Sequence, residues 1–257
     1  MKLISLNTWG GKVYQPLINF IKQSGDTDIF CFQEVFNTNS NFKEMSGFRM
    51  NLFDEISKVL ENYQVYFAPT VDNYIAGSFQ PNFIDFNLSW GLAIFVKKNL
   101  SIKAHNDFWV YGNRGSFNPK DLNSLSRNVQ YINFISGGKK FTICNIHGIW
   151  VKGGKKDTPS RIQQSKQILS FLDQQDGEKI LCGDFNLDID TKSIKMLEST
   201  LTNLIKKYHI KNTRSRFFPA NEKFADYTFV SPDINVTNFQ VPDIDISDHL
   251  PMILEFS

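Results

Sequence analysis

Short apolar runs recur along the whole chain, and each gives way abruptly to polar residues. Runs of this length that are rich in Ile, Val and Phe are typical of β-strands with buried side chains. The pattern predicts strands at 2–7, 28–34, 65–69, 91–98, 100–110, 127–135, 140–147, 179–184, 226–231, 234–240 and 251–256. The pair Gly137 and Gly138 predicts a hairpin turn between two of these strands.

Apolar residues at helical spacing separate several of the strands. One such segment has clear start signals, because Asp157 or Thr158 can cap its first turn and Pro159 fits within that turn. The pattern predicts helices at 17–23, 51–63, 157–173 and 192–201. Hairpins mixed with helical crossovers indicate an α+β fold, in which two sheets pack together with helices outside.

Residues 70–89 are rich in Asn, Phe and Gly and predict a long surface loop. We expect substrate selectivity to reside in this loop and in segments 36–50 and 112–126, since loops on a rigid scaffold carry recognition. No linker, repeat or low-complexity segment interrupts the sequence. We therefore predict a single domain that spans residues 1–257.

Net charge, apolar runs and cysteines exclude few classes of protein. The net charge of +2 is too small to indicate nucleic-acid binding by itself. No apolar run reaches the ~20 residues that span a bilayer, and the first residues do not resemble a secretion signal, so we expect a cytoplasmic protein. Cys31, Cys144 and Cys182 each lie inside an apolar run, and their odd number favours free thiols over disulfides.

Polar residues that can bind a metal ion or transfer a proton follow five of the apolar runs. The ends of buried strands are places where a rigid sheet holds such groups in a fixed geometry. These residues are Asn7, Glu34, His147, the pair Asp184 and Asn186 in GDFN (183–186), and the pair Asp248 and His249 in SDHLP (247–251).

Each position also has a structural interpretation. Asp184 and Asn186 point the same way if their strand continues, and could then align a water molecule, but both residue types also favour turns. Glu34 could bind a divalent cation or form a salt bridge. Asn7 could simply begin a turn, and Asp226 could orient an imidazole or cap a turn.

The motifs LNTWGG, FQEV, NIHG, GDFN, DYTFVS and SDHLP occur in this order between residues 3 and 253. In this they resemble the endonuclease/exonuclease/phosphatase superfamily, which has the deoxyribonuclease I-like fold. The resemblance implies a four-layer α/β/β/α sandwich of two mixed sheets flanked by helices. It also implies metal-dependent hydrolysis of a phosphate ester.

The resemblance implies that Glu34 is the main ligand of a Mg²⁺ or Mn²⁺ ion, with Asn7 and Asp248 nearby. Oxygen ligands without a Cys or His cluster favour Mg²⁺ over Zn²⁺.

The resemblance also implies catalytic roles for five residues. Asp184 would position and deprotonate the attacking water, and Asn186 would help to hold that water or the phosphate. His249, oriented by Asp226, would stabilise the phosphoryl oxygens, and His147 would contact the phosphate from the other side.

The substrate stays open at this point. The His in NIHG resembles the deoxyribonuclease I, sphingomyelinase and tyrosyl-DNA phosphodiesterase branches, whereas Ala225, Asp226 and Tyr227 depart from the Cys-Asp-Arg run of inositol-polyphosphate 5-phosphatases. We expect a monomer that hydrolyses a phosphodiester, first of all in nucleic acid. A small-molecule or lipid head-group phosphate is the alternative, and an inactive binding module is a more distant one.

Candidate substrate-binding residues lie beside these motifs. Trp150 and Lys152, followed by Lys155, Lys156 and Arg161, could form a rim that grips a nucleic-acid backbone, with Trp9 near it. The same segment could be an ordinary solvated loop. Arg127 could clamp a phosphate or pair with a carboxylate of the sheet.

Overall fold

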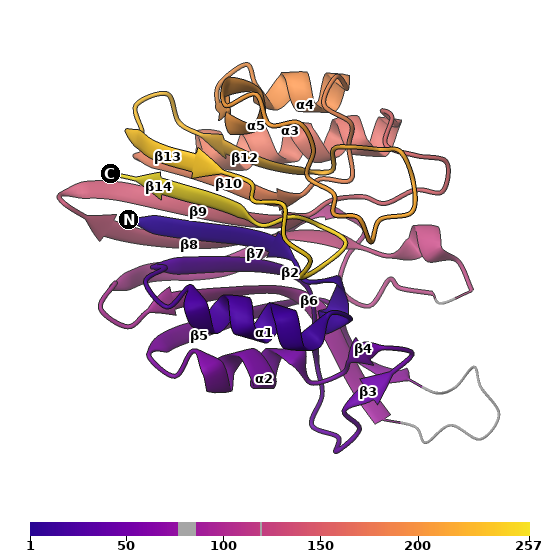
Figure 1. Cartoon of the computed structure of the whole chain (residues 1–257). Helices are drawn as coiled ribbons and strands as arrows, with labels where there is room; N and C mark the ends of the chain where they lie inside the picture. The colour runs from indigo at the N-terminus through magenta and orange to yellow at the C-terminus, as the bar shows by residue number, and fades with distance from the viewer. Residues whose placement is uncertain (77–85, 119) are drawn as a thin grey trace.

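The computed structural model describes residues 1–76, 86–118 and 120–257, in which two six-stranded sheets pack face to face. Helices cover both outer faces (Figure 1). The predicted four-layer sandwich is therefore confirmed. Sheet 1 has the order β13 (Val236–Gln240), β14 (Met252–Phe256), β1 (Lys2–Asn7), β2 (Ile29–Asn37), β6 (Phe86–Lys97), β5 (Tyr63–Ala76).

Sheet 2 is built mainly from the second half of the chain. Its strand order is β11 (Thr202–Asn203), β12 (Asp226–Val230), β10 (Glu178–Asp184), β9 (Lys139–His147), β8 (Arg127–Ser136), β7 (Ile102–Tyr111). A small hairpin, β3 (Glu44–Met45) and β4 (Phe48–Arg49), stands apart from both sheets.

The helices divide between the two outer layers. Sheet 1 is covered by α1 (Tyr14–Gln23) and α2 (Leu52–Val59), and α3 (Pro159–Asp173), α4 (Lys192–Leu197) and α5 (Leu204–Lys207) lie over sheet 2 (Figure 1). Two short 3₁₀ helices, Trp9–Gly11 and Leu122–Ser124, lie in connections.

Alternation along the central strands explains why the layers stack. Successive side chains of a strand point to opposite faces, so Leu3 packs between the sheets while Ile4 packs under the helices. The same holds for Cys31 and Phe30 in β2. Strands buried on both faces read as continuous apolar runs, which is why the sequence revealed them.

Parallel pairing brings functional strand ends to one edge of the sandwich. β1 runs parallel to β2, and β9 runs parallel to β10. Between the sheets, Gln33 donates to Asn145 over 2.7 Å, and Asn145 donates to the carbonyl oxygen of Phe32 over 3.0 Å. This buried polar link sets the two sheets in register just below that edge.

Several predicted elements have other bounds in the structure; the helix expected at 192–201, for example, ends at Leu197. The helix expected at 51–63 ends at Val59, because Tyr63 already begins β5. The loop expected at 70–89 is wrong for 70–76 and 86–89, which extend β5 and β6 as a bulged ribbon; its middle lies outside the described residues. The content of Asn, Phe and Gly suggested a loop, but pairing between the strands and the contact between the rings of Tyr74 and Trp90 override that preference.

The three cysteines are buried and free, as expected. Within the described residues, no helix is long and apolar enough to cross a membrane. The assignment of residues 1–257 to one domain stays a prediction.

Candidate active site

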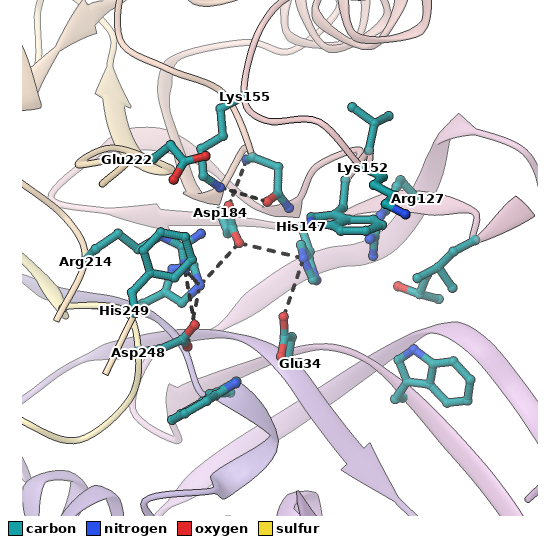
Figure 2. A pocket seen from close by; sticks show the side chains of 18 of the residues that line it. Glu34, Arg127, His147, Lys152, Lys155, Asp184, Arg214, Glu222, Asp248 and His249 are labelled. Carbon is teal, nitrogen blue, oxygen red and sulfur yellow. Dashed lines mark hydrogen bonds and ion pairs between the residues drawn. The ribbon is translucent and has the colours of Figure 1, made fainter. Parts of the chain in front are cut away.

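A cavity of about 520 Å³ opens at the edge where the strand ends meet. Most of the predicted site residues line it: Glu34, Arg127, His147, Trp150, Lys152, Asp184, Asn186, Asp248 and His249 (Figure 2). Asn7 and Asp226 lie directly behind this lining and bond to it. The structure therefore brings together residues that are spread over nearly the whole sequence.

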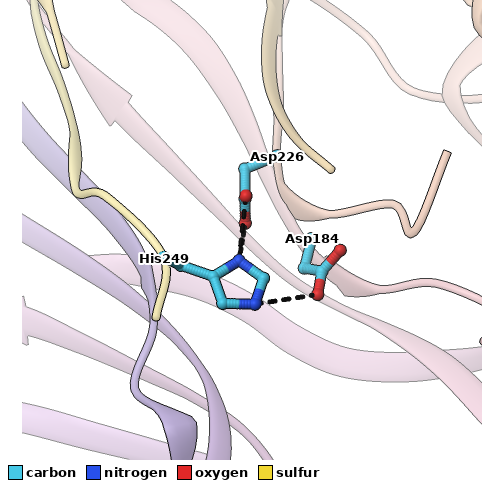
Figure 3. Close-up of side chains that lie close together, drawn as sticks. All are labelled: Asp184, Asp226 and His249. Carbon is cyan, nitrogen blue, oxygen red and sulfur yellow. Dashed lines mark hydrogen bonds and ion pairs between the residues drawn. The ribbon is translucent and has the colours of Figure 1, made fainter. Parts of the chain in front are cut away.

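Three of these residues form one row across sheet 2. Asp184, at the end of β10, is paired with His147 of β9 on one side and with Asp226 of β12 on the other. His249 reaches this row from the turn before β14: its Nδ1 donates to Asp226 Oδ1 over 2.8 Å, and its Nε2 lies 3.6 Å from Asp184 Oδ2 (Figure 3). A buried carboxylate thus fixes the orientation of the imidazole.

Glu34 reaches the cavity through a distortion of β2. The pairing with β6 shifts between Phe32 and Val35, and Glu34 within this bulge has a left-handed φ of 56°. Bulges redirect side chains, and non-glycine residues rarely adopt this conformation. The amide nitrogen of Asn7 donates to Glu34 Oε1 over 3.0 Å and to Asp184 Oδ2 over 3.2 Å, which links the two sheets.

Asn186 lies beside Asp184, but not for the reason expected. β10 ends at Asp184, and Asn186 has a left-handed φ of 54°, so the assumption that the strand continues is wrong. Instead, the backbone N–H of Asn186 donates to Asp184 Oδ1 over 2.8 Å in an Asx-type turn. The turn interpretation and the proximity of the two side chains are therefore both correct.

Gly183 allows this edge to close. It has a φ of 135°, and a Cβ atom built on it would lie 2.1 Å from the carbonyl oxygen of Ile146 in β9. Only glycine permits so close an approach of the two backbones. His147 and Asp184, the next residues on the two strands, are held side by side as a result.

Neighbouring charges determine the ionisation of the buried groups. Burial alone would raise the pKa of Asp184, but the positive charges of His249 and Lys155 outweigh it and hold that pKa well below its usual range. Burial raises the pKa of Glu34, and the hydrogen bond from Asn7 opposes this rise. The Glu34 side chain is 30% exposed, so a cation can reach it.

The pKa values of the two imidazoles, His147 and His249, are shifted in opposite directions. Burial, with the charge of Arg127, lowers the pKa of His147 well below its ordinary value, so this ring is neutral at neutral pH. Burial would also lower the pKa of His249, but the carboxylates of Asp226 and Asp184 outweigh it and raise that pKa. Burial lowers the pKa of Arg127 to about 10, which leaves it charged at neutral pH.

Comparison with known proteins agrees with this geometry. The sequence profile of the endonuclease/exonuclease/phosphatase family matches residues 4–249. The chain belongs to this family. Members of the family are generally phosphoester hydrolases, and no curated protein sequence matches the chain significantly.

Solved structures of the family share the fold over the whole chain. A mannosyl-6-phosphatase from Bacteroides thetaiotaomicron has a TM-score of 0.73 and 20% identity, covering 100% of this chain and 99% of that one. The human Nocturnin catalytic domain has a TM-score of 0.68 and 17% identity, covering 100% of this chain and 94% of that one. A humanized TDP2 of D. rerio has a TM-score of 0.70 and 14% identity, covering 100% of this chain and 98% of that one. At these identities the likeness shows the fold alone.

Family enzymes typically depend on a divalent metal, and the residues present fit one. Glu34, Asp184 and Asp248 offer carboxylate oxygens to the cavity, which suit Mg²⁺ or Mn²⁺. The carboxylates and imidazole of Asp184, Asp226 and His249 also lie within 4.8 Å of one another and could bind a metal. Since His249 Nδ1 already contacts both oxygens of Asp226, this group is better suited to hydrogen bonding.

The predicted ligand role of Asn7 stays a prediction. Its Oδ1 accepts a hydrogen bond from the backbone N–H of Trp9 over 3.0 Å, and this contact turns the amide nitrogen towards Glu34 and Asp184. Asn7 therefore orients the carboxylates in this structure.

The basic segment after His147 separates into distinct parts. Lys152 and Trp150, which is 44% exposed, lie at the mouth of the cavity. Arg161 also lines the cavity, but it is 1% exposed and donates to the carbonyl oxygens of Ile149, Gly154 and Lys156 instead of facing the solvent as a rim residue would. It clamps the loop that carries the other residues.

Sequence reasoning missed Arg214, Phe218 and Glu222, which line the cavity from the segment before β12. Arg214 Nη1 donates to Asp248 Oδ2 over 3.4 Å and also contacts His249 Nε2. No apolar run precedes this segment, so the strand-end pattern could not reveal it. The run of Arg and Phe in TRSRFFP (213–219) was the one available signal.

Proposed function

We propose that this protein is a divalent-metal-dependent hydrolase that cleaves a P–O ester bond by in-line attack of water. The observation that carries the proposal is the row of His147, Asp184 and Asp226, of which His147 and Asp184 line one cavity together with Glu34. Acid–base groups, a cation-accessible carboxylate and buried arginines at one point match the needs of phosphoryl transfer.

Asp184 is the residue that holds the attacking water and accepts its proton. Its low pKa keeps it ionised at neutral pH, and Asn7 and Asn186 donate to its two oxygens and fix its orientation. Lys155 bonds to Asn186 Oδ1 over 3.2 Å, so the amide group of Asn186 also stays in place. A fixed base spares the reorganisation that a mobile one requires.

The imidazoles of His249 and His147 bind the phosphoryl oxygens from opposite sides of Asp184. His249 Nε2 and His147 Nε2 lie 3.6 Å and 3.8 Å from Asp184 Oδ2. Asp226 keeps the Nε2 atom of His249 pointing into the cavity.

Glu34, with Asp248 nearby, would hold the Mg²⁺ or Mn²⁺ ion. A divalent cation bound there supplies positive charge that offsets the negative charge building on the phosphoryl oxygens. Asn7 aligns Glu34 with Asp184, so the cation and the water are positioned relative to each other.

Hydrolysis of bis(p-nitrophenyl) phosphate and p-nitrophenyl phosphate tests this function. We expect turnover with Mg²⁺ or Mn²⁺, none with EDTA, and recovery when metal is restored. The Asp184→Asn variant, which keeps the shape of the side chain, serves as the control for contaminating enzymes. Absence of metal-dependent turnover on any phosphoester would favour a binding module on the same fold.

Two substrate classes compete. A nucleic-acid phosphodiester stays the prediction from sequence, and Trp150 and Lys152 at the mouth could stack a base and contact its backbone. However, several other cations outside the cavity are already neutralised: Lys156 by Asp188, Arg216 by Asp245 and Arg114 by Asp107.

A compact phosphorylated molecule is the second candidate, favoured by the volume of the cavity, about 520 Å³, which is in the range of small-molecule sites. One solved structure that shares the fold is a mannosyl-6-phosphatase. A panel of single-stranded DNA, duplex DNA, RNA, 5′-tyrosyl DNA, sugar phosphates, inositol phosphates and sphingomyelin separates the candidates. Cleavage of DNA or RNA at rates above all small molecules would select the first.

A further inference from the structure

Three buried cations surround the cavity with donors left free. Arg127, Lys155 and Arg214 are only 5%, 8% and 9% exposed. The side chain of Arg127 forms no hydrogen bond or ion pair with the described residues, and its Nε is buried. Buried charges without partners are costly, so a cation held in this way indicates an anion that binds beside it.

Arg214 is held rigidly on the other side. Its guanidinium lies 4.2 Å from the ring centre of Phe218, and its Nη1 contacts Asp248 and His249. A backbone bridge between Arg214 and His249 fixes its position further. Among the described residues its buried Nε has no hydrogen-bond partner, so the donors of this preorganised fork are not all used.

Lys155 completes the set. Its Nζ has one hydrogen-bond acceptor among the described residues, Asn186 Oδ1. An ammonium group has three donors, so two of them are free to face the cavity. In Figure 2, Arg127 and Arg214 lie on opposite sides of Asp184, with Lys155 above it.

The charges around the reacting centre indicate how many negative charges the substrate brings. The cavity lining holds four carboxylates, from Glu34, Asp184, Glu222 and Asp248, and five cations, from Arg127, Lys152, Lys155, Arg161 and Arg214. A bound divalent cation would raise this excess of one positive charge to about three. A terminal phosphate carries about two negative charges and three acceptor oxygens at neutral pH, whereas a phosphodiester has one charge and two free oxygens.

Building on the proposed function, we infer that Arg127, Lys155 and Arg214 form a three-cation clamp that selects a phosphomonoester dianion over a phosphodiester. Glu222 strengthens this selection. It is a cavity-lining carboxylate that forms no hydrogen bond or ion pair with the described residues, and it would repel the neighbouring phosphate of a nucleic-acid strand.

A matched pair of substrates tests the inference. p-Nitrophenyl phosphate and methyl p-nitrophenyl phosphate share a leaving group and differ by a methyl group that removes one charge and caps one oxygen. We expect kcat/KM with Mg²⁺ to favour the monoester by at least ~10-fold. Charge-assisted hydrogen bonds of this kind each contribute a factor of roughly 10 to 100, so Arg214→Gln or Lys155→Gln should reduce the preference by about that factor.

Controls separate recognition from folding. Arg216→Gln removes a neighbouring arginine that is 74% exposed and paired with Asp245, and should leave the preference unchanged. Arg214→Lys keeps the charge and should retain most of the preference. Thermal unfolding of each variant shows whether the fold is intact. A wild-type preference for the diester, or variants that lose both activities equally, would overturn the clamp.

Binding gives a readout that does not depend on turnover. With Asp184→Asn protein and Mg²⁺, calorimetry should show orthophosphate binding at least ~10-fold more tightly than dimethyl phosphate, and Arg214→Gln should remove this difference. Equal binding of the two anions contradicts the clamp even if hydrolysis occurs. If neither ester is hydrolysed, the proposed reaction fails while the binding measurement still decides the inference.

Discussion

The two sheets bring different chemistry to the cavity in which their strand ends meet. Sheet 1 presents Glu34, and the turn leading into its β14 presents Asp248, both of which offer oxygens to a cation. Sheet 2 presents the row of His147, Asp184 and Asp226, which suits proton transfer. The site thus has a metal half on sheet 1 and a proton-transfer half on sheet 2. Because the sheets are separate layers, their alignment decides whether the two halves act on one phosphate. The amide of Asn7 and the pair Gln33 and Asn145 provide that alignment.

The two sheets also differ in how the backbone places their functional residues. Glu34 lies in a bulge and itself has a left-handed φ, whereas His147 and Asp184 end two strands that pair without a shift of register. The proton-transfer half is thus fixed by pairing between strands, and the metal half by a local distortion. We expect substitutions in the first half to reduce the rate and substitutions in the second to reduce metal affinity.

The largest effect should follow the change Asp184→Asn. It keeps the shape of the side chain but removes the proton acceptor and replaces one of the two oxygens that accept from Asn7 and Asn186 by a donor, so kcat should fall by roughly 10²- to 10⁴-fold. Turnover of p-nitrophenyl phosphate with Mg²⁺ measures the loss, and titration with Mn²⁺ should show metal affinity changed far less. Near wild-type turnover would remove Asp184 from the proton-transfer half.

The change Glu34→Gln should produce the opposite signature. The metal concentration that gives half-maximal activity should rise by at least ~10-fold, since even residues that only orient metal ligands contribute 10- to 100-fold to affinity. High Mn²⁺ should restore part of the rate. The control is Glu61→Gln, an exposed residue outside the cavity. An unchanged metal requirement would move the metal site to another set of residues.

Asn145→Ala tests the alignment of the halves. Gln33 Nε2 loses its shortest contact, at 2.7 Å, and the carbonyl oxygen of Phe32 loses the donor at 3.0 Å. The loss of buried hydrogen bonds should lower the free energy of unfolding by about 1–3 kcal/mol. Urea unfolding measures the cost, and Asn235→Ala, at an exposed hydrogen bond to Ser257, is the control. A variant as stable as the control would show that the sheets are aligned by apolar packing alone.

The smallest effect concerns Tyr63, in sheet 1 away from the cavity. Burial raises the pKa of Tyr63 to about 12, and its hydroxyl donates to the carbonyl oxygen of Thr27. A raised pKa means that the contribution to stability is complete below the pKa of the unfolded chain, about 10. It is then lost as the pH rises towards 12. The stability of wild type relative to Tyr63→Phe should therefore decline over this range in urea unfolding, with no change in turnover at neutral pH.

The sequence predicted the parts of the site that local pattern encodes. A buried strand that ends in a polar residue appears in the sequence as an apolar run followed by that residue. Asn7, His147 and Asp184 could therefore be placed at one edge of the sheets. The family resemblance then connected the motifs. The bulge at Glu34 has no such signal, because it arises from pairing with β6 rather than from residues near it in sequence.

Tertiary contacts explain the remaining differences. Arg214 belongs to an irregular segment, and a backbone bridge to His249, 35 residues later, brings it to the cavity. Arg161 looked like part of a basic rim but is buried beneath the loop it supports. In both cases the position and burial of the side chain depend on contacts with residues that are distant in sequence, and the local sequence pattern does not reveal these contacts.

Gly183 sets a limit on how this protein can be redesigned. Any larger residue there would collide with the carbonyl oxygen of Ile146 and would push the neighbouring chain segments apart. A library randomised at this codon and selected for turnover should return glycine alone, whereas the mouth residues Trp150 and Lys152 should accept many replacements. Attempts to evolve new specificity can therefore vary the entrance freely but must keep this one position constant.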